Sequence, residues 1–283
     1  MEKKNLSIIG LLERELQLRN YSPRTVHTYV ELVKRTENHI GIPFDKITTD
    51  QYKNYIHQRI TKDGVSTSTV NQMLSVYKIV QVDLLKRDWE SIKIKRPRRN
   101  KKLPVVLSQA EVEKLINAAS NIKHRAILML AYGSGLRRQE TQMIKAGAID
   151  SERMQVHIVQ GKGKKDRYSI LPHKALNILR QYYRLERPSC YLFEPQGKKS
   201  KHMSEQALNS LVKKAAVKAG IKKQISFHTL RHCFATHLLE NGVNLRIIQQ
   251  FLGHTSLKTT AVYLHLANIA PGSINSPLDK LDV

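Results

Sequence analysis

The sequence predicts a mainly α-helical protein of two domains: four helices in the N-terminal part, and then a mostly α domain that contains a small antiparallel sheet. Three observations lead to this fold class. Apolar residues recur at helical spacing over most of the 283 residues, two-residue alternation is confined to residues 148–172, and a basic stretch with two prolines separates the two parts. An apolar fraction of 41% is typical of a folded chain, and the length suffices for two domains.

Charge and composition indicate a polyanionic partner. The chain carries 48 lysines and arginines against 23 acidic residues, so its formal net charge is +25 and its pI is about 10.1. Such an excess indicates nucleic acid first and an anionic membrane surface second. No apolar run reaches about 18 residues, so no span of the bilayer is expected. Two cysteines do not make a disulfide framework, which favours a reduced, cytosolic protein.

The N-terminal domain, residues 1–92, shows the start signals of helices. Ser22 is expected to be an N-cap with Pro23 at the first helical position, because serine accepts from a free backbone N–H and proline lacks one. The third helix is expected to begin at Thr49, and Ser68 is expected to cap the fourth. Apolar residues at i, i+3, i+4 and i+7 give these helices a face for a core.

Residues 93–104 are expected to form a basic linker, because they combine a run of lysines and arginines with two prolines and no hydrophobic period. A solvated connector is one interpretation. The favoured one is a segment along a DNA backbone, where each neutralised phosphate releases counterions. The second domain is expected over residues 105–269, followed by a tail over residues 270–283.

The second domain begins with two helices and a candidate site. Ser108 and Glu111 have the spacing of a capping box. The next helix, residues 122–131, is strongly apolar and therefore buried, and it stops at a glycine turn directly before Arg137 and Glu140. An arginine and a glutamate three residues apart in this position are placed for a site. A surface ion pair, which contributes little stability, is the alternative that the local pattern leaves open.

Residues 148–172 predict a small antiparallel sheet with a basic hairpin. The hairpin reads Gly161-Lys162-Gly163-Lys164-Lys165-Asp166. Because no strand–G-x-x-x-x-G-K-[ST]–helix pattern is present, a nucleotide-binding loop is disfavoured. The lysines either are solvated at the hairpin tip or reach a site.

The stretch from residue 225 to 266 holds polar residues inside an apolar helical pattern. His228 and Arg231 are three residues apart and share a helix face. His254 follows a glycine that ends a helix, and Tyr263 comes nine residues later. Three short helices are expected here, over residues 229–240, 244–252 and 256–267.

These groups together fit attack on a phosphodiester. The guanidinium forks of Arg137 and Arg231 match two phosphate oxygens and keep their charge. Tyr263 is a potential nucleophile that needs a nearby positive charge or a base, since the pKa of an unperturbed phenol is about 10. Lys162 could protonate the leaving hydroxyl from the hairpin.

Three alternatives remain open at this point. His228 and His232 have the i, i+4 spacing of a zinc pair, with Cys233 adjacent, but no glutamate stands between them as in H-E-x-x-H and no clear third ligand follows. Tyr263 could be a core tyrosine, since apolar residues surround it. His228 could simply cap its own helix.

Four motifs, taken together, resemble the tyrosine recombinases, also called phage integrases, and are most similar to the Xer and integron-integrase branch. The motifs are G-L-R at 135–137, G-K-G at 161–163, H-T-L-R-H at 228–232 and L-G-H-T-S-L-K-T-T-A-V-Y at 252–263. Their order and spacing make the signal specific, and the match spans essentially the whole chain. The resemblance implies an N-terminal core-binding (SAM-like) domain followed by a catalytic domain.

By this resemblance Tyr263 is expected to be the nucleophile, which forms a 3′-phosphotyrosine and frees a 5′-hydroxyl. That bond conserves the energy of the broken phosphodiester, so no cofactor and no metal are expected. Lys162 would be the general acid, and Glu140 would support the site. The phosphate pocket is expected to consist of Arg137, His228, Arg231 and His254.

The resemblance further implies that a homotetramer acts on two double-stranded DNA sites with paired inverted repeats, through a Holliday junction, at the nucleoid in a bacterial cytoplasm. No membrane partner is expected, and accessory proteins are left open. The tail, with Ile274, Leu278 and Leu281, is expected to dock on a neighbouring protomer. DNA contacts are expected from Arg24, Lys95, Arg96, Arg98, Arg99, Lys101 and Lys164.

Two other functions stay open. A non-catalytic DNA-binding or architectural protein would share the basic surface but would have no use for the complete polar set. A nicking-closing enzyme like the type IB topoisomerases would share the chemistry. It would differ in that no strands are exchanged between two sites.

Overall fold

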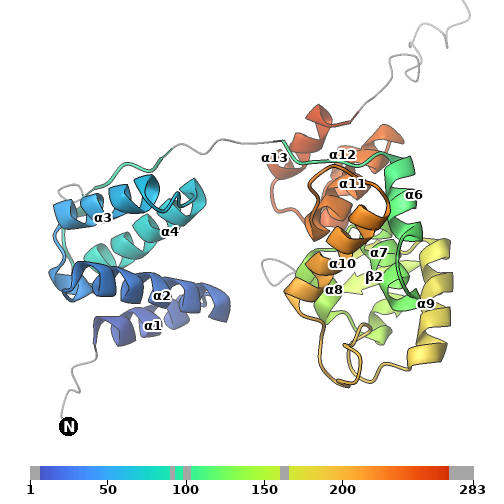
Figure 1. Ribbon diagram of the computed structural model, residues 1–283, viewed down its shortest axis with the longest axis horizontal. Coiled ribbons are helices and arrows are strands. Elements are labelled where there is room, and N and C mark those ends of the chain that lie inside the picture. Colours follow the sequence, from blue (N-terminus) through green and yellow to red (C-terminus); the bar gives the residue numbers. More distant parts are fainter. Residues whose placement is uncertain (1–6, 90–92, 98–102, 160–165, 268–283) are drawn as a thin grey trace, which may run out of the picture. The chain divides into compact units, whose positions relative to one another are not determined.

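The computed structural model describes residues 7–89, 93–97, 103–159 and 166–267. The chain divides into two compact units, Met1–Lys101 and Lys102–Val283, each with its own core (Figure 1). The described part is mostly helical with a small antiparallel sheet, which confirms the predicted fold class.

The first unit contains the four predicted helices. They are α1 (Ile8–Leu18), α2 (Pro23–Ile40), α3 (Thr49–Thr61) and α4 (Thr67–Lys78), with a 3₁₀ turn η1 (Phe44–Lys46) and a π-helical turn η2 (Ile79–Leu84). Ser22 caps α2 as predicted, and its hydroxyl accepts from Thr25 N. The predicted cap of α4 was wrong: Ser66, which has an extended backbone, accepts from Thr69 N at 3.2 Å, and Ser68 lies inside the first turn.

The core of the first unit contains a group of aromatic rings among aliphatic side chains. Tyr52 and Tyr77 stack with ring centroids 4.2 Å apart, and both are fully buried. Residues 93–97, the start of the predicted linker, lie on this unit: Ile94 packs against its core, and the Arg96 guanidinium donates to Asn71 O at 3.0 Å and to Ser75 Oγ at 3.1 Å. This part of the linker is therefore attached to α4.

The second unit surrounds a central helix. Its elements are α6 (Gln109–Asn117), α7 (Ile122–Gly133), α8 (Arg138–Met143), η3 (Ala146–Ala148), β1 (Ile149–Asp150), β2 (Gln155–Ile158), β3 (Arg167–Ile170), α9 (His173–Glu186), α10 (Glu205–Lys218), α11 (Phe227–Glu240), α12 (Leu245–Leu252), α13 (Leu257–Thr260) and η4 (Ala261–His265). Figure 1 shows α7 enclosed by α6, α9 and α11. The strands pair antiparallel in the order β1-β2-β3, with Val156 opposite Ser169.

The last predicted helix, residues 256–267, is not one helix. The structure has a single α turn, α13, followed by the 3₁₀ helix η4. The stretch holds two threonines and a valine, which are weak helix formers, and a 3₁₀ turn is a common way for a short helix to end. Tyr263 lies on η4 and faces α11.

The second unit begins with a segment that is fixed to α11. Leu107 N donates to Cys233 Sγ at 3.2 Å, and Leu107 O pairs with His237 Nε2 at 2.9 Å. The Tyr132 hydroxyl holds the other nitrogen of His237 at 2.9 Å. Since Cys233 and His237 are both buried, the chain enters this unit through contacts in its core.

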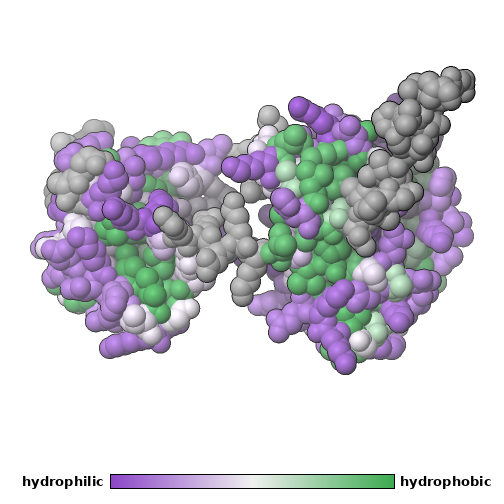
Figure 2. All heavy atoms as spheres, turned by 90° about the horizontal axis from the view of Figure 1, so that it is seen from above, coloured by the Kyte–Doolittle hydropathy of each residue, from purple (hydrophilic) through white to green (hydrophobic). Residues whose placement is uncertain are grey.

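Viewed from above, each unit shows hydrophilic side chains over much of its surface and one area where hydrophobic side chains gather (Figure 2). Exposed apolar residues of the second unit include Ile247 on α12 and Leu264 on η4. Within the described residues, no helix has both the length and the apolar character that a membrane crossing needs.

Candidate active site

A glycine turn places the first candidate arginine. After α7 the chain turns at Gly135, whose φ of +59° favours glycine. A Cβ at Gly135 would come within 2.3 Å of the Phe234 ring, so the turn also lies directly against α11. Arg137 follows as the N-cap residue of α8, and its backbone N–H donates to the Glu140 carboxylate at 2.6 Å.

Glu140 is the centre of the site. Its carboxylate accepts from Arg137 Nη1 at 2.7 Å and from both terminal nitrogens of Arg167, at 2.5 and 2.7 Å. Burial opposes its ionisation, but the hydrogen bonds and charges of Arg167 and Arg137 outweigh burial and lower the pKa of Glu140 to about 2. The interpretation as a surface ion pair is therefore wrong, because the Glu140 side chain is only 8% exposed.

Sequence reasoning missed Arg167. This residue opens β3, where the side chains of Arg167 and Ser169 alternate into the interior, and its own side chain is 7% exposed. An arginine at an inward-facing position of a strand was the available signal, since charged side chains are rarely buried without a partner. Its partner is Glu140 on α8.

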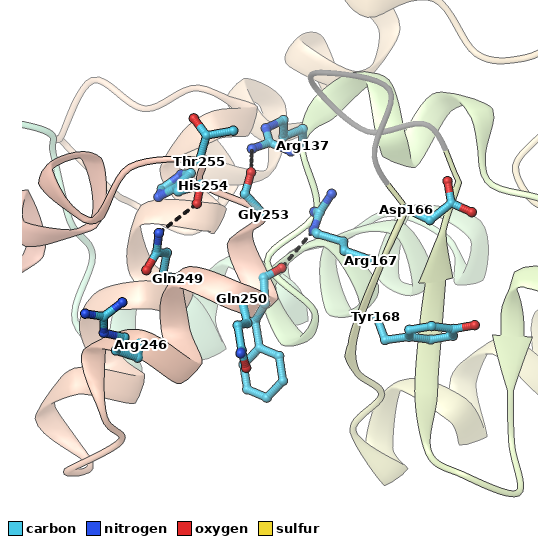
Figure 3. A pocket seen from close by; sticks show the side chains of 11 residues that line it. Arg137, Asp166, Arg167, Tyr168, Arg246, Gln249, Gln250, Gly253, His254 and Thr255 are labelled. Carbon is cyan, nitrogen blue, oxygen red and sulfur yellow. Dashed lines mark hydrogen bonds between the residues drawn. The ribbon is translucent and has the colours of Figure 1, made fainter.

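The C-terminal end of α12 accepts from all three arginines. Arg167 Nε donates to Phe251 O at 2.8 Å, Arg137 Nη2 donates to Leu252 O at 3.0 Å and to Gly253 O at 3.2 Å, and Arg231 Nη2 also donates to Leu252 O. Figure 3 shows Arg137 and Arg167 reaching these carbonyls. The last carbonyls of a helix lack partners within it and carry partial negative charge. They therefore hold the guanidinium groups in place.

Arg231 lies deepest in the site. Its side chain is 4% exposed, and Nη1 donates to Gly135 O at 2.6 Å. Burial and the nearby charge of Arg137 lower its pKa to about 9. Three guanidinium groups face the single carboxylate of Glu140, so the cluster carries an excess of two positive charges. Such an excess in a buried place favours the binding of an anion.

The two candidate histidines lie at this cluster. His254 pairs through Nε2 with Arg231 Nη2 at 3.2 Å and through Nδ1 with Thr260 Oγ1 at 2.9 Å. His228 is in the first turn of α11; partial burial of its ring and the charge of Arg231 lower its pKa. The interpretation of His228 as a helix cap was wrong, because Ser226 is the N-cap.

Tyr263 is buried, 2% exposed, and lies near enough to the cluster for the charges of Arg231 and Arg137 to act on its hydroxyl. Its hydroxyl lies 3.2 Å from His232 Nδ1. Burial raises the pKa of Tyr263, while the charges of Arg231 and Arg137 oppose that rise. Tyr263 can therefore be both a buried residue of the core and a residue of the site.

Sequence reasoning gave His232 no role beyond a zinc pair. Its position one helical turn after His228 was the available signal.

A cavity of about 620 Å³ opens beside the cluster, between β3 and α12 (Figure 3). Arg137 and His254 line the cavity on the side of the arginine cluster. Tyr168 on β3 and Asp166, the residue before β3, line it on another side, and Arg246 lines it from α12. The predicted acid Lys162 and the predicted DNA contact Lys164 lie outside the described residues.

The predicted DNA contacts of the first unit are only partly described. Arg24, near the start of α2, and Lys95 are exposed, while Arg96 donates to α4. The predicted contacts Arg98, Arg99 and Lys101 lie outside the described residues. Within the described part of the chain, no three His, Cys, Asp or Glu side chains are grouped so that they could hold a metal ion.

Two family descriptions match the chain. Residues 105–269, more than half of the chain, match the phage integrase family, and residues 9–91 match the N-terminal SAM-like domain of phage integrases. These two ranges correspond closely to the two units of the structure.

Two curated relatives are similar to this chain over most of its length and most of theirs. An integrase/recombinase of Sinorhizobium fredii is 34% identical over 95% of this chain and 88% of its own, and a tyrosine recombinase of Thermosipho africanus is 31% identical over 89% and 92%. The crystal structure of XerA recombinase is 28% identical with a TM-score of 0.55, over 92% of this chain and 94% of that one.

A further solved structure shares the fold. The site-specific recombinase XerH, bound to its palindromic difH substrate, has a TM-score of 0.70 at 21% identity, over 92% of this chain and 82% of that one. The arginine–glutamate cluster, the adjacent tyrosine and the relatives lead to one conclusion. The chain belongs to the phage integrase family, the tyrosine recombinases, and is a site-specific DNA recombinase.

Proposed function

We propose that this chain cleaves and rejoins DNA with Tyr263 as its nucleophile and with Arg137 and Arg231 as the clamp on the scissile phosphate. The observation that carries the proposal is the buried cluster in which three guanidinium groups face one carboxylate, with the charges of two of them, Arg231 and Arg137, acting on the Tyr263 hydroxyl. A phosphodiester brings the negative charge that this cluster lacks.

In the proposed cleavage step, the Tyr263 oxygen attacks phosphorus and the bond to the 5′ oxygen breaks. The product is a 3′-phosphotyrosine and a free 5′-hydroxyl. Arg137, Arg231 and the two histidines, His228 and His254, would stabilise the charge that grows on the non-bridging oxygens. Glu140 would hold Arg137 in place. Rejoining is the reverse reaction, so the energy of the phosphodiester is kept and no nucleotide is needed.

The leaving 5′ oxygen needs a proton, for which we propose Lys162 on the hairpin between β2 and β3. A Lys162→Ala variant should cleave slowly. A 5′-phosphorothiolate substrate should restore its rate, because a thiolate leaves without protonation. If the sulfur substrate gave no such rescue, another group would be the acid.

Tyr263 is buried, so the proposed attack requires a shift of η4 that exposes the phenolic oxygen to the phosphate when DNA binds and keeps its contact with His232 on α11. A 3₁₀ helix of five residues after a single α turn is a short element that can shift at small cost. The exposed basic residues Arg24 and Lys95 support DNA contact by the first unit, whereas the Arg96 guanidinium already donates to α4. The charge of +25 supports long-range attraction.

We further propose that four protomers act on two duplex sites with inverted repeats, through a Holliday junction. The reaction would take place at the nucleoid of a bacterial cell and would serve a mobile element. Residues 270–283 would link neighbouring protomers. Deleting residues 271–283 should then impair pairing of the two DNA sites; unchanged tetramers on DNA would contradict this role of the tail.

The deciding experiment traps the covalent intermediate. The full-length chain first selects its site from a pool of random duplexes, and the selected site is then prepared as a nicked suicide duplex. Wild type should form a covalent protein–DNA adduct, and Tyr263→Phe should form none. An adduct that persists in Tyr263→Phe would refute the nucleophile. Exchange of strands between two labelled sites separates a recombinase from a nicking-closing enzyme.

A further inference from the structure

The hydroxyl of Tyr263 has a partner to which the proposed chemistry gives no role. His232 Nδ1 lies 3.2 Å from the Tyr263 hydroxyl, and the two ring centroids are 5.9 Å apart. Among the hydrogen bonds within the described ranges, this is the one that the hydroxyl makes. His232 therefore lies at the O–H bond that must break when tyrosine attacks.

The surroundings of His232 keep its ring neutral, which allows Nδ1 to accept from the phenol. The charged or titratable groups that face His232 are His228 and Arg231 from its own helix and Tyr263 from η4. Burial, then His228 and Arg231, lower the pKa of His232 to about 4. Near neutral pH the ring is therefore uncharged. With its proton on Nε2, Nδ1 is an acceptor, and the phenol is the donor.

We propose that His232 accepts the phenolic proton of Tyr263 during DNA cleavage and returns it during rejoining. The inference rests on the proposed function. In cleavage, the proton moves from the Tyr263 oxygen to His232 Nδ1 as the O–P bond forms, and the bond to the 5′ oxygen breaks. That oxygen takes its proton from the acid, proposed to be Lys162. In rejoining, the 5′-hydroxyl gives its proton to the acid site, the P–O bond to tyrosine breaks, and Nδ1 returns the proton.

Substrate binding makes this acceptor stronger. Arg231 and His232 are consecutive residues of α11, and the charge of Arg231 is one of the causes that keep His232 neutral. A phosphate bound to Arg231 brings a negative charge that offsets the guanidinium charge. The imidazole then holds a proton more readily, at the moment when the nucleophile must lose one. Proton acceptance is thereby coupled to occupancy of the phosphate pocket.

His228 fits this role less well in the structure. Its ring centroid is 6.4 Å from that of His232, and none of the described hydrogen bonds joins it to Tyr263. His228 also has exposed surface, which suits contact with DNA. The two histidines lie one turn apart on α11 and have different proposed roles: His228 contacts the phosphate, and His232 contacts the phenol.

The test removes proton acceptance and then makes it unnecessary. His232→Gln keeps a polar group near the phenol but cannot take up a proton. Single-turnover adduct formation is measured on the selected nicked duplex, with either tyrosine or 3,5-difluorotyrosine at position 263. With tyrosine the rate should fall at least about 100-fold, the lower end of what a positioned base contributes. The phenol of difluorotyrosine is ionised at lower pH. With difluorotyrosine at position 263, the adduct rate of His232→Gln should therefore come close to that of the chain that keeps His232.

Controls separate this role from a structural one. A drop of the same size with both phenols, or no drop with tyrosine, would overturn the inference. His265→Gln, at an exposed histidine of η4, should match wild type with both phenols. Melting curves of the full chain check that His232→Gln folds.

The proposed function can fail separately. If wild type forms no adduct, or if Tyr263→Phe keeps it, the nucleophile is wrong, and the role of His232 falls with it. If both behave as proposed while His232→Gln cleaves at the wild-type rate, only the role of His232 is refuted.

Discussion

The guanidinium group of Arg167 and the carboxylate of Glu140 form a two-point ion pair, with N–O distances of 2.5 and 2.7 Å. The same carboxylate holds Arg137, whose other terminal nitrogen reaches the end of α12. A strand residue outside the four motifs thus sets the position of an arginine in the proposed phosphate clamp.

Removing Arg167 should therefore harm both stability and chemistry. In Arg167→Met, Glu140 loses its strongest partner, and breaking a buried pair costs about 3–5 kcal/mol of unfolding free energy. The adduct rate should fall as Arg137 shifts toward the carboxylate. The double variant Arg167→Met/Glu140→Gln should regain part of the stability and none of the rate. Calorimetry of the full chain and the adduct assay measure both. A single variant that melts like wild type would show that the pair is not structural.

Acid should weaken the second unit through Glu140. Its pKa is lowered from 4.5 to about 2 in the folded chain, so it stabilises the fold above its unfolded pKa, and this contribution is lost as pH falls from about 4.5 to 2. The shift corresponds to about 3 kcal/mol. Glu194 also has a pKa of about 2, so its loss overlaps in pH. The difference in unfolding free energy between wild type and Glu140→Gln is measured as a function of pH. The part of it that changes with pH gives the contribution of Glu140 alone. If that difference stays constant between pH 5 and 2, the lowered pKa is refuted.

Gly135→Ala should be far more damaging than its backbone strain alone explains. A Cβ there would lie 2.3 Å from the Phe234 ring, in a turn with φ of +59°. Gly242→Ala is the matched control, because it has φ of +78° with nothing within 4 Å of the added Cβ. The control should lose about 1 kcal/mol of stability. Gly135→Ala should lose clearly more and should also cleave slowly, since Arg137 follows the turn. Equal melting temperatures for the two variants would contradict the close contact.

Salt dependence tests the predicted DNA contact of Lys95. If its ammonium neutralises one phosphate, Lys95→Ala should reduce the slope of log K against log salt by about 1. Lys53→Ala is the control, since Lys53 on α3 already pairs with Asp50 at 3.1 Å and should leave the slope unchanged. Binding of the selected duplex between 50 and about 200 mM salt gives both slopes. Equal slopes for wild type and Lys95→Ala would remove Lys95 from the interface.

Local signals predicted most of the fold. Ser22-Pro23 and the Ser108–Glu111 box mark helix starts because capping depends on neighbours in sequence, and both are observed. The cap at Ser66 was missed because three hydroxyl residues follow closely and the pattern does not rank them. The four motifs identified the family because they hold the residues that the chemistry requires.

The rest depends on contacts between distant residues. Arg167 pairs with Glu140 and His232 pairs with Tyr263 only after β3, α8, α11 and η4 have assembled, and no sequence period reports such pairs. The burial of Tyr263 has the same origin. Helical spacing could say that its neighbours are apolar, but not that the packing of η4 on α11 encloses the hydroxyl.

The attachment of Leu107 to α11 has a mechanical consequence. The chain that arrives from the first unit is held by Cys233 and His237, on the helix that also carries Arg231 and His232. A pull on residues 103–106 is therefore transmitted as a force on that helix, at residues that lie one to six positions from Arg231 and His232. Because the contacts use the backbone of Leu107, a substitution at that position leaves both backbone groups in place unless it introduces proline, which lacks the N–H. Tension in the connector would therefore act on α11, the helix that positions Arg231 and His232.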